Sequence, residues 1–273
     1  MTLMFESIDL SSRVGSEIRA DKPGLLNGDY SKQIEKLLVE RSALVFRELF
    51  LGDEEQLQFA RTIGKVVPLG AEGVSKISLD PTVSDTAGYT RGAFFWHIDG
   101  ANDKLPAKAT MLTARVLSDG GGDTLICNTY AAYEDLPEKE KRELDGVKVR
   151  HALEATQRCV HPQPTAAELT RWRTRPSQTH PLVWHHQHGG SSLLLGATSL
   201  YVHDRSPEDS SMLLCRLQDY ATQSPYVYRH KWKVGDFLLW DNTGTMHRAD
   251  DYPLNSKRLM HRTTLHGEEP VIG

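Results

Sequence analysis

The sequence predicts a single, mainly β domain, with an antiparallel strand core and helices packed outside it. Short runs rich in branched and aromatic residues recur along the chain and are typical of strands. Segments with apolar residues three and four apart lie between them and predict amphipathic helices. The 273 residues are 39% hydrophobic and 25% charged, which is enough to bury one large core. No repeat, low-complexity tract or linker divides residues 1–273, so we expect one domain.

The first half of the chain predicts two helices and a series of strands. Helices are expected over 31–40 and 53–63, where Asp53 is the predicted N-cap and Gly64 the stop. Residues 66–93 are rich in Gly and Ser and weakly patterned, which indicates loops with short strands. Strands are expected over 43–49, 94–98, 109–117 and 123–129.

The second half continues the strand series around one irregular stretch. Residues 155–180 lack a clear pattern apart from a short helix expected at Thr165 and Glu168, which have capping-box spacing. Long segments of this kind are commonly active-site lids, so we predict a mobile lid over 155–180. Helices are also expected over 137–144 and 206–223, a hairpin over 180–197, and strands over 226–232, 236–240 and 258–266.

Charge and cysteine usage exclude several classes of partner. The formal net charge of −4 gives no reason to expect nucleic acid or an anionic membrane surface. The N-terminus lacks the basic start and apolar stretch of a signal peptide, and no apolar run could span a bilayer. Cys127, Cys159 and Cys215 are odd in number and far apart, which indicates free thiols in a reducing compartment. We therefore expect a cytoplasmic protein, and the sequence does not decide between a monomer and a homo-oligomer.

Three residues have the chemistry of a metal site. His97 and Asp99 are two apart in FFWHID, and in a strand both side chains would project to one face. The pair alone is weak evidence, but His247 follows a later strand-like run. Two imidazoles and one carboxylate form the facial triad that suits Fe(II) and leaves positions open for a cosubstrate and dioxygen. Zinc more often takes three histidines or a set that contains cysteine.

Other histidines are weaker candidates. A cluster in and just before WHHQHGG looks like a metal tract and comprises His180, His185, His186 and His188, although a hairpin turn with solvated histidines is the favoured interpretation. The remaining histidines show no ligand-like spacing and are expected on the surface or hydrogen-bonded in the core.

Arg258 and Arg262 predict an anion site. They are four apart on a predicted strand and therefore share a face. A solvated basic edge is the alternative, but the intervening Leu and Met residues favour an inward-facing pair. A guanidinium aimed inward needs an anionic partner, and its planar fork fits a carboxylate. Thr124 follows three glycines, and its hydroxyl could complete such a carboxylate site.

These motifs together resemble the taurine dioxygenase / 2,4-dichlorophenoxyacetate dioxygenase family of Fe(II)- and 2-oxoglutarate-dependent oxygenases. The resemblance covers residues 31–269 and is carried by WHID at 96–99, GGDT at 121–124, AAYEDLP at 131–137, RHKWKVGDFLLWDNTGTMHRA at 229–249, and the two arginines that follow. It implies a double-stranded β-helix, a cupin-like jelly roll, with the iron site in its interior.

The resemblance also implies roles for the site residues. Fe(II) would be held by His97, Asp99 and His247, and the far carboxylate of 2-oxoglutarate by Arg258 and Thr124. Arg262 would contact 2-oxoglutarate, the substrate, or both. Trp240 and Asn242, in WDN, would support the metal strand. The implied reaction is hydroxylation of a substrate coupled to conversion of 2-oxoglutarate and dioxygen to succinate and CO2.

The expected substrate is a small organic anion. Sulfonate-binding members of the family place a histidine before the metal motif, whereas residues 64–96 contain none. This favours an aryl or alkyl carboxylate, with Phe94 and Phe95 as an aromatic wall. A sulfonate or alkyl sulfate ester is the alternative substrate. A non-catalytic metal-binding jelly roll and a zinc hydrolase are the alternatives from other classes.

Overall fold

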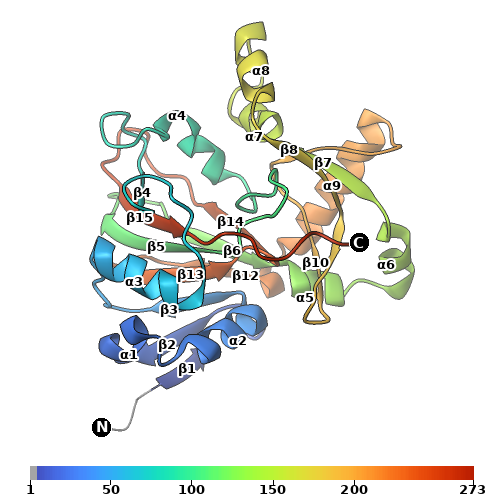
Figure 1. The fold of residues 1–273 in the computed structure, drawn as a ribbon. Helices are drawn as coiled ribbons and strands as arrows, with labels where there is room; N and C mark the ends of the chain where they lie inside the picture. The colour runs from blue at the N-terminus through green and yellow to red at the C-terminus, as the bar shows by residue number, and fades with distance from the viewer. Residues whose placement is uncertain (1–4) are drawn as a thin grey trace.

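Two facing sheets form the core of the computed structural model, which describes residues 5–273 (Figure 1). One sheet is seven-stranded, in the order β1-β2-β3-β13-β5-β15-β4, and the other has the order β12-β6-β14. Within these sheets the neighbouring strands are antiparallel, except that β2 and β3 are parallel. The strands of the large sheet are β1 Phe5–Asp9, β2 Ser16–Ala20, β3 Ala43–Phe46, β4 Ser75–Ile77, β5 Ala109–Val116, β13 Phe237–Asp241 and β15 Leu259–Thr264. Those of the small sheet are β6 Thr124–Asn128, β12 Val227–His230 and β14 Thr245–Ala249.

Alternation along the strands separates two layers of core. In β13, Leu238 and Trp240 project between the two sheets and pack in one cluster with Ile126 of the small sheet. Phe237 and Leu239 project to the other face and pack against the helices. All five side chains are buried. Successive residues of a strand point to opposite faces, so this strand is buried on both sides and reads as a continuous apolar run.

Helices α1 Lys22–Asn27, α2 Ser31–Arg41 and α3 Asp53–Ile63 cover the outer face of the large sheet (Figure 1). Their contact is centred on Phe46, Phe59 and Phe237, whose ring centroids lie 5.2–5.8 Å apart. The helices predicted over 31–40 and 53–63 are confirmed as α2 and α3. The N-cap of α3 is Gly52 rather than Asp53, and Glu55 accepts a 2.9 Å hydrogen bond from its backbone N–H.

A second group of elements packs beside the small sheet around another apolar cluster that contains Trp184. Its strands are β7 Lys148–Ala152, β8 Ser177–Pro181, β9 Val183–His185, β10 Ser191–Leu193 and β11 Ser199–Val202. Its helices are α5 Thr129–Glu134, α6 Glu138–Leu144, α9 Pro207–Ala221 and the short η2 Ser224–Tyr226. The hairpin predicted over 180–197 is confirmed as β9 and β10.

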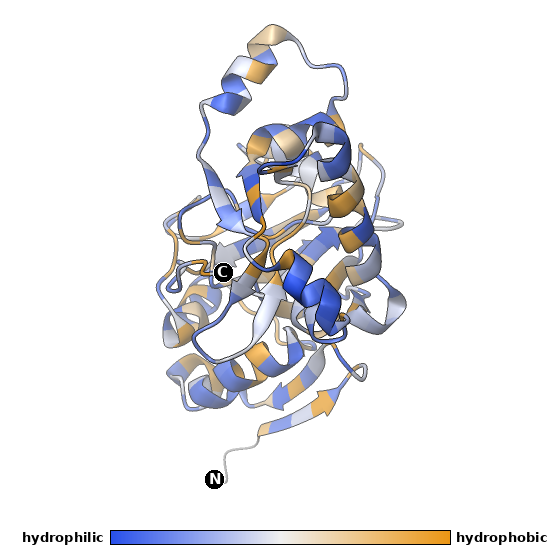
Figure 2. Ribbon diagram, turned by 90° about the vertical axis from the view of Figure 1, so that its right-hand side faces the viewer, coloured by the Kyte–Doolittle hydropathy of each residue, from blue (hydrophilic) through white to orange (hydrophobic). Residues whose placement is uncertain are grey.

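Residues 155–180 are more regular than the sequence indicated. They contain most of α7 Leu153–Val160, all of α8 Ala166–Arg173, and the start of β8. The capping box predicted for α8 is confirmed, because Thr165 and Glu168 exchange hydrogen bonds. α8 stands away from the rest of the chain in both views (Figures 1 and 2), while Arg173 pairs with Glu154 of α7 at 2.7 Å.

The strand predicted over 94–98 is wrong. Helix α4 Ala87–Thr90 leads into a 3-10 turn, η1 Arg91–Phe94, and only His97 of this stretch forms a β-bridge. Phe95 is 38% exposed, so the aromatic run does not pack as a unit in the core. No helix within residues 5–273 combines the length and the apolar character needed to cross a membrane.

Candidate active site

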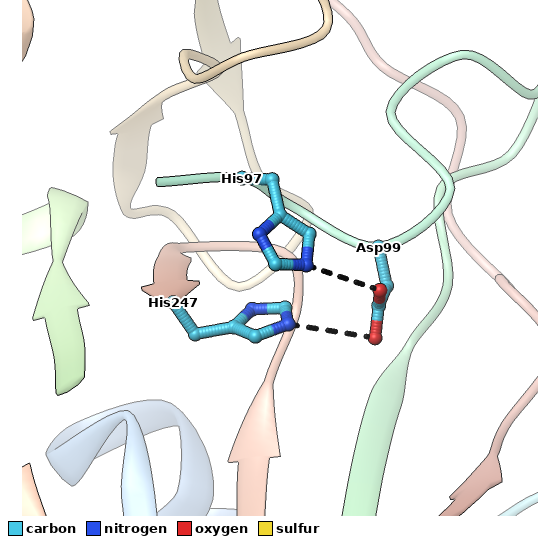
Figure 3. A group of neighbouring side chains, drawn as sticks. All are labelled: His97, Asp99 and His247. Atoms are coloured by element: carbon cyan, nitrogen blue, oxygen red, sulfur yellow. Dashed lines mark ion pairs between the residues drawn. The ribbon is translucent and has the colours of Figure 1, made fainter. Parts of the chain in front are cut away.

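The three predicted metal ligands lie together at one end of the space between the two sheets. His247 is on the inward face of β14, the face that Ile126 shares on neighbouring β6. His97 forms an antiparallel bridge with His247, with backbone N–O distances of 3.0 Å and 2.8 Å. Asp99 follows two residues later and turns back toward both rings. In Figure 3 the two imidazoles and the carboxylate point toward one another.

Their geometry fits a metal ion. One ligand atom from each residue lies within 4.8 Å of the others. The Nε2 atoms of His97 and His247 are 3.8 Å and 3.7 Å from the two oxygens of Asp99. Nδ1 of His97 lies 2.8 Å from the carbonyl oxygen of Phe95, which can only accept, so Nδ1 carries the proton and Nε2 is free to bind a metal. Two neutral imidazoles and one carboxylate are the donor set that suits Fe(II).

A chain of buried hydrogen bonds orients the Asp99 carboxylate. The hydroxyl of Thr110 donates to Oδ2 of Asp99 at 2.7 Å, and Nδ2 of Asn242 donates to Thr110 at 2.8 Å. Nε1 of Trp240 in turn donates to Oδ1 of Asn242 at 3.0 Å. Thr110 and Trp240 are cross-strand partners on β5 and β13, so the sheet register fixes this chain. The WDN motif therefore acts on the metal carboxylate through Thr110.

The electrostatics favour the protonation states that bind a metal. Burial would raise the pKa of Asp99, but His247, Arg262, His97 and the Thr110 hydroxyl act against it, and the net pKa is below its usual range. Burial and neighbouring His97 lower the pKa of His247 to about 3. At neutral pH the site therefore presents an ionised carboxylate and an uncharged His247 ring.

A cavity of about 310 Å³ opens from the triad. It is lined by all six residues that the sequence predicts as ligands of the metal and of 2-oxoglutarate, namely His97, Asp99, Thr124, His247, Arg258 and Arg262. The space between the sheets thus combines a metal-binding corner with two guanidinium groups. Such a cavity can hold a small anion next to a bound metal.

Arg258 lies in the wall of this cavity. It is 3% exposed, donates to the carbonyl oxygen of Gly122 at 3.0 Å, and stacks over the ring of Tyr252 at 4.9 Å. Burial lowers its pKa. Gly122 has φ +81°, and a Cβ there would lie 2.9 Å from Nε of Arg258. The glycines before Thr124 therefore allow the backbone to approach the guanidinium closely.

Thr124 and Arg262 also line this cavity. The Thr124 hydroxyl oxygen accepts a 2.9 Å hydrogen bond from Nε1 of Trp232, which leaves its own proton to donate into the cavity. The Arg262 side chain makes no hydrogen bond to any residue within 5–273, and its Nη1 is 3.8 Å from Oδ1 of Asp99. Arg262 and Met260 share the inward face of β15, whereas Arg258 immediately precedes that strand.

Two sequence-based expectations about neighbouring residues are wrong. Phe94 and Phe95 do not line the cavity that contains the triad; they line two other hollows beside Cys159. The histidine tract is not wholly solvated, because the side chain of His186 is buried and bonded to Ser192 at 2.8 Å. The triad is the one cluster with metal-ligand geometry among residues 5–273.

The sequence analysis missed Thr110, Trp232 and the part of the cavity wall that α7 supplies. Thr110 follows Asp99 by eleven residues in no recognisable motif, and only its pairing with Trp240 reveals it. Trp232 lies within the quoted HKW segment, so a search for buried indole donors near Thr124 could have found it.

Comparisons with known proteins agree with this geometry. The sequence profile described as "Taurine catabolism dioxygenase TauD, TfdA family" matches residues 6–264. An alpha-ketoglutarate-dependent 2,4-dichlorophenoxyacetate dioxygenase of Burkholderia sp. (strain RASC) is 33% identical, over 89% of this chain and 88% of its own. An alpha-ketoglutarate-dependent sulfate ester dioxygenase of Pseudomonas putida is 32% identical, over 96% and 89%.

Solved structures give the same result. A crystal structure of AAD-2 in complex with Mn(II) and N-oxalylglycine superposes with a TM-score of 0.85 at 27% identity, covering 99% of this chain and 100% of that one. A putative alpha-ketoglutarate-dependent taurine dioxygenase from Burkholderia xenovorans superposes with a TM-score of 0.80 at 27% identity, covering 98% and 94%. The predicted jelly-roll core is confirmed. This chain belongs to the TauD/TfdA family and is a dioxygenase that depends on Fe(II) and 2-oxoglutarate.

Proposed function

We propose that the enzyme hydroxylates a small organic acid, with His97, Asp99 and His247 as the Fe(II) ligands. Bound Fe(II) supplies the centre at which 2-oxoglutarate and dioxygen react to give succinate and CO2 as the substrate is oxidised. The protein holds the His247 imidazole uncharged and the Asp99 carboxylate ionised, which are the forms that bind the metal. The support is the clustering of these three side chains at the end of one cavity.

The far carboxylate of 2-oxoglutarate is assigned to Arg258 and Thr124. Both line the cavity, both are buried, and both can donate hydrogen bonds toward its interior. A guanidinium and a carboxylate form a strong pair when the geometry allows two parallel hydrogen bonds. The AAD-2 structure contains N-oxalylglycine. Like 2-oxoglutarate, this molecule has a carboxylate next to a carbonyl group at one end and a second carboxylate at the other.

The proposal that the substrate is an anion rests on the position of Arg262. Its guanidinium lines the cavity beside the triad, has no hydrogen-bond acceptor among residues 5–273, and lies 3.8 Å from Oδ1 of Asp99. An inward guanidinium without a protein acceptor favours a carboxylate of the ligand. The relatives include enzymes named for 2,4-dichlorophenoxyacetate and (S)-phenoxypropionate, which are aryloxyalkanoates. We place the substrate in this carboxylate class.

A sulfate ester is the second candidate. One relative that covers nearly the whole chain is named a sulfate ester dioxygenase, and a guanidinium binds either anion. The test is a panel of aryloxyalkanoates, alkyl sulfates, taurine and neutral analogues, scored by consumption of 2-oxoglutarate. Acids should stimulate turnover and neutral analogues should not. Equal stimulation by neutral analogues would contradict the anion proposal.

We also propose that residues 155–180 cover the cavity as a lid within a single domain of residues 1–273. Support comes from α7, which contributes to the cavity wall, and from α8, which projects outward (Figure 1). Limited proteolysis should cut this segment more slowly when 2-oxoglutarate, an acid substrate and an inert divalent metal are bound. Equal cleavage rates with and without these ligands would show that residues 155–180 are a surface segment that does not cover the cavity.

The cellular location is proposed from the cysteines. Cys127 is buried and Cys159 and Cys215 are exposed, and all three are free thiols. Exposed free thiols persist in a reducing compartment, so we place the enzyme in the cytoplasm.

A further inference from the structure

One face of α7 forms part of the cavity wall and carries two polar side chains. Leu153, Thr156 and Gln157 all line the cavity. Thr156 and Gln157 follow Leu153 by three and four residues, so the three side chains lie on one face of the helix. The next two residues, Arg158 and Cys159, are exposed on the opposite side. The inward face of α7 therefore presents a hydroxyl and an amide where a core helix would present apolar groups.

These two polar groups have no hydrogen-bond partner among the residues that the structure describes. Thr156 is 8% exposed and Gln157 2% exposed, yet neither side chain hydrogen-bonds to any residue within 5–273, and Oγ1 of Thr156 is fully buried. α7 packs tightly here: a Cβ at Gly92 would lie 2.9 Å from Cγ2 of Thr156 and 3.6 Å from Nε2 of Gln157. Glycine at 92 thus lets η1 pack against this face of the helix.

Three other uncharged polar side chains around the cavity, those of Thr90, Asn102 and Thr198, hydrogen-bond within the protein. The Thr90 hydroxyl donates to the carbonyl oxygen of Ser78 at 3.2 Å, and Nδ2 of Asn102 donates to that of Pro176 at 3.1 Å. Thr198 bonds to His151 at 3.0 Å. A buried polar group without a partner costs about 1–3 kcal/mol, so folding alone does not favour the polar groups on α7.

We propose that Thr156 and Gln157 bind an uncharged hydrogen-bonding group of the substrate, such as a hydroxyl or a carbonyl. This inference rests on the proposed function and deepens it. The acidic group of the substrate contacts Arg262, and the second polar group contacts α7. A site whose buried polar groups are completed by a substrate rejects the analogue that lacks the matching group, because its own groups are then left unpaired. The substrate is therefore an organic acid with a second, neutral polar group rather than a purely apolar tail.

The first test uses matched acids and Gln157→Leu. The probes are the 2-, 3- and 4-hydroxyphenoxyacetates and the corresponding methylphenoxyacetates, scored by succinate formation. At least one hydroxy acid should exceed its methyl counterpart by about tenfold or more in kcat/KM. Gln157→Leu should remove or reverse that preference, and Thr156→Val should weaken it. If every methyl acid matches its hydroxy counterpart, or if Gln157→Leu retains the preference, the cavity polar groups contact only water and the inference is wrong.

The second test needs no substrate. Replacing an unpaired buried amide by an apolar group is neutral or stabilising, whereas replacing a paired one is destabilising. Gln157→Leu should therefore keep or raise the Tm. Gln56→Leu is the matched control, because Gln56 is equally buried but donates to Oγ1 of Thr263 at 2.9 Å, and it should lower the Tm. A comparable loss in Gln157→Leu would show a structural role and overturn the inference.

The two proposals fail in different ways. Turnover of the methyl acids with no preference for hydroxyl groups leaves the acid oxygenase in place and removes the role of α7. Absence of stimulation by any acid contradicts the proposed substrate class, and the Tm comparison then decides the inference about Gln157 by itself.

Discussion

The hydroxyl of Thr110 donates a 2.7 Å hydrogen bond to Oδ2 of Asp99, the single carboxylate of the metal triad. Thr110 is fully buried, and Asn242 donates to its oxygen, so its proton can point only to Asp99. Partners of this kind fix the orientation of a metal ligand and typically change metal affinity by about 10–100-fold when removed.

Thr110→Val should therefore lower the affinity for Fe(II), or for Co(II) as a stable probe, by about tenfold or more. The measurement is a metal titration of the apoprotein, and Thr110→Ser should restore binding. Thr113→Val is the matched control. Thr113 lies on the same strand as Thr110, but its hydroxyl donates to Gln56 of α3, away from the cavity. Equal metal affinity in Thr110→Val and the wild type would contradict this role.

Trp232 should tune the affinity for 2-oxoglutarate through Thr124. Its indole N–H occupies the acceptor side of the Thr124 hydroxyl and so directs the proton of that hydroxyl into the cavity. Trp232→Phe should weaken 2-oxoglutarate binding by about two- to tenfold, as expected for one neutral hydrogen bond, with metal affinity unchanged. In Trp184→Phe, where the indole N–H has no partner within residues 5–273, the affinity should not change.

Arg258→Ala should weaken 2-oxoglutarate binding far more. Removing one partner of a buried charge pair costs about 3–5 kcal/mol, or about a hundredfold or more in affinity. Isothermal titration of the metal-loaded enzyme measures this, with the exposed Arg216→Ala as the control. If Arg258→Ala binds 2-oxoglutarate as well as the wild type, the distal carboxylate belongs to Arg262 instead.

The sequence predicted the elements whose burial follows a simple period. β13 is a nearly continuous apolar run that is buried on both faces, and α9 begins with the expected Ser206 cap and Pro207. The triad and the arginines could be found because their residue types and their spacing are specific to a chemistry. Thr110 could not, because its role depends on a strand register that joins residues far apart in the chain.

Two errors have a common physical cause. Residues 94–98 look like a strand, but they follow the 3-10 turn Arg91–Phe94, in which Gly92 packs against α7, and only His97 among them pairs with a strand. α7 was not predicted, and the side that it turns toward the cavity carries the polar residues Thr156 and Gln157 beside Leu153. Segments that face a ligand cavity do not follow the patterns that segments facing a core obey.

Acid should destabilise the fold through His151. Burial, with a contribution from His180, lowers the pKa of His151 to about 3, against about 6.5 in an unfolded chain. The unfolded state therefore binds more protons between these values, and the free energy of unfolding falls as pH decreases, by up to about 1.4 kcal/mol per pH unit. His151→Gln should reduce this slope between about pH 6 and pH 4 in denaturant titrations. A slope as steep as that of the wild type would contradict the assignment, and the exposed His161→Gln serves as the control.

The most direct test is the oxygen- and Fe(II)-dependent conversion of 2-oxoglutarate to succinate, measured with the most stimulating acid of the substrate panel. The wild type should form succinate in step with oxidation of that acid. His97→Ala and His247→Ala should abolish both products while the circular dichroism spectrum stays that of the folded wild type, since each removes one of three ligands that meet within 4.8 Å. Full succinate formation by either variant would contradict the assignment of the metal site.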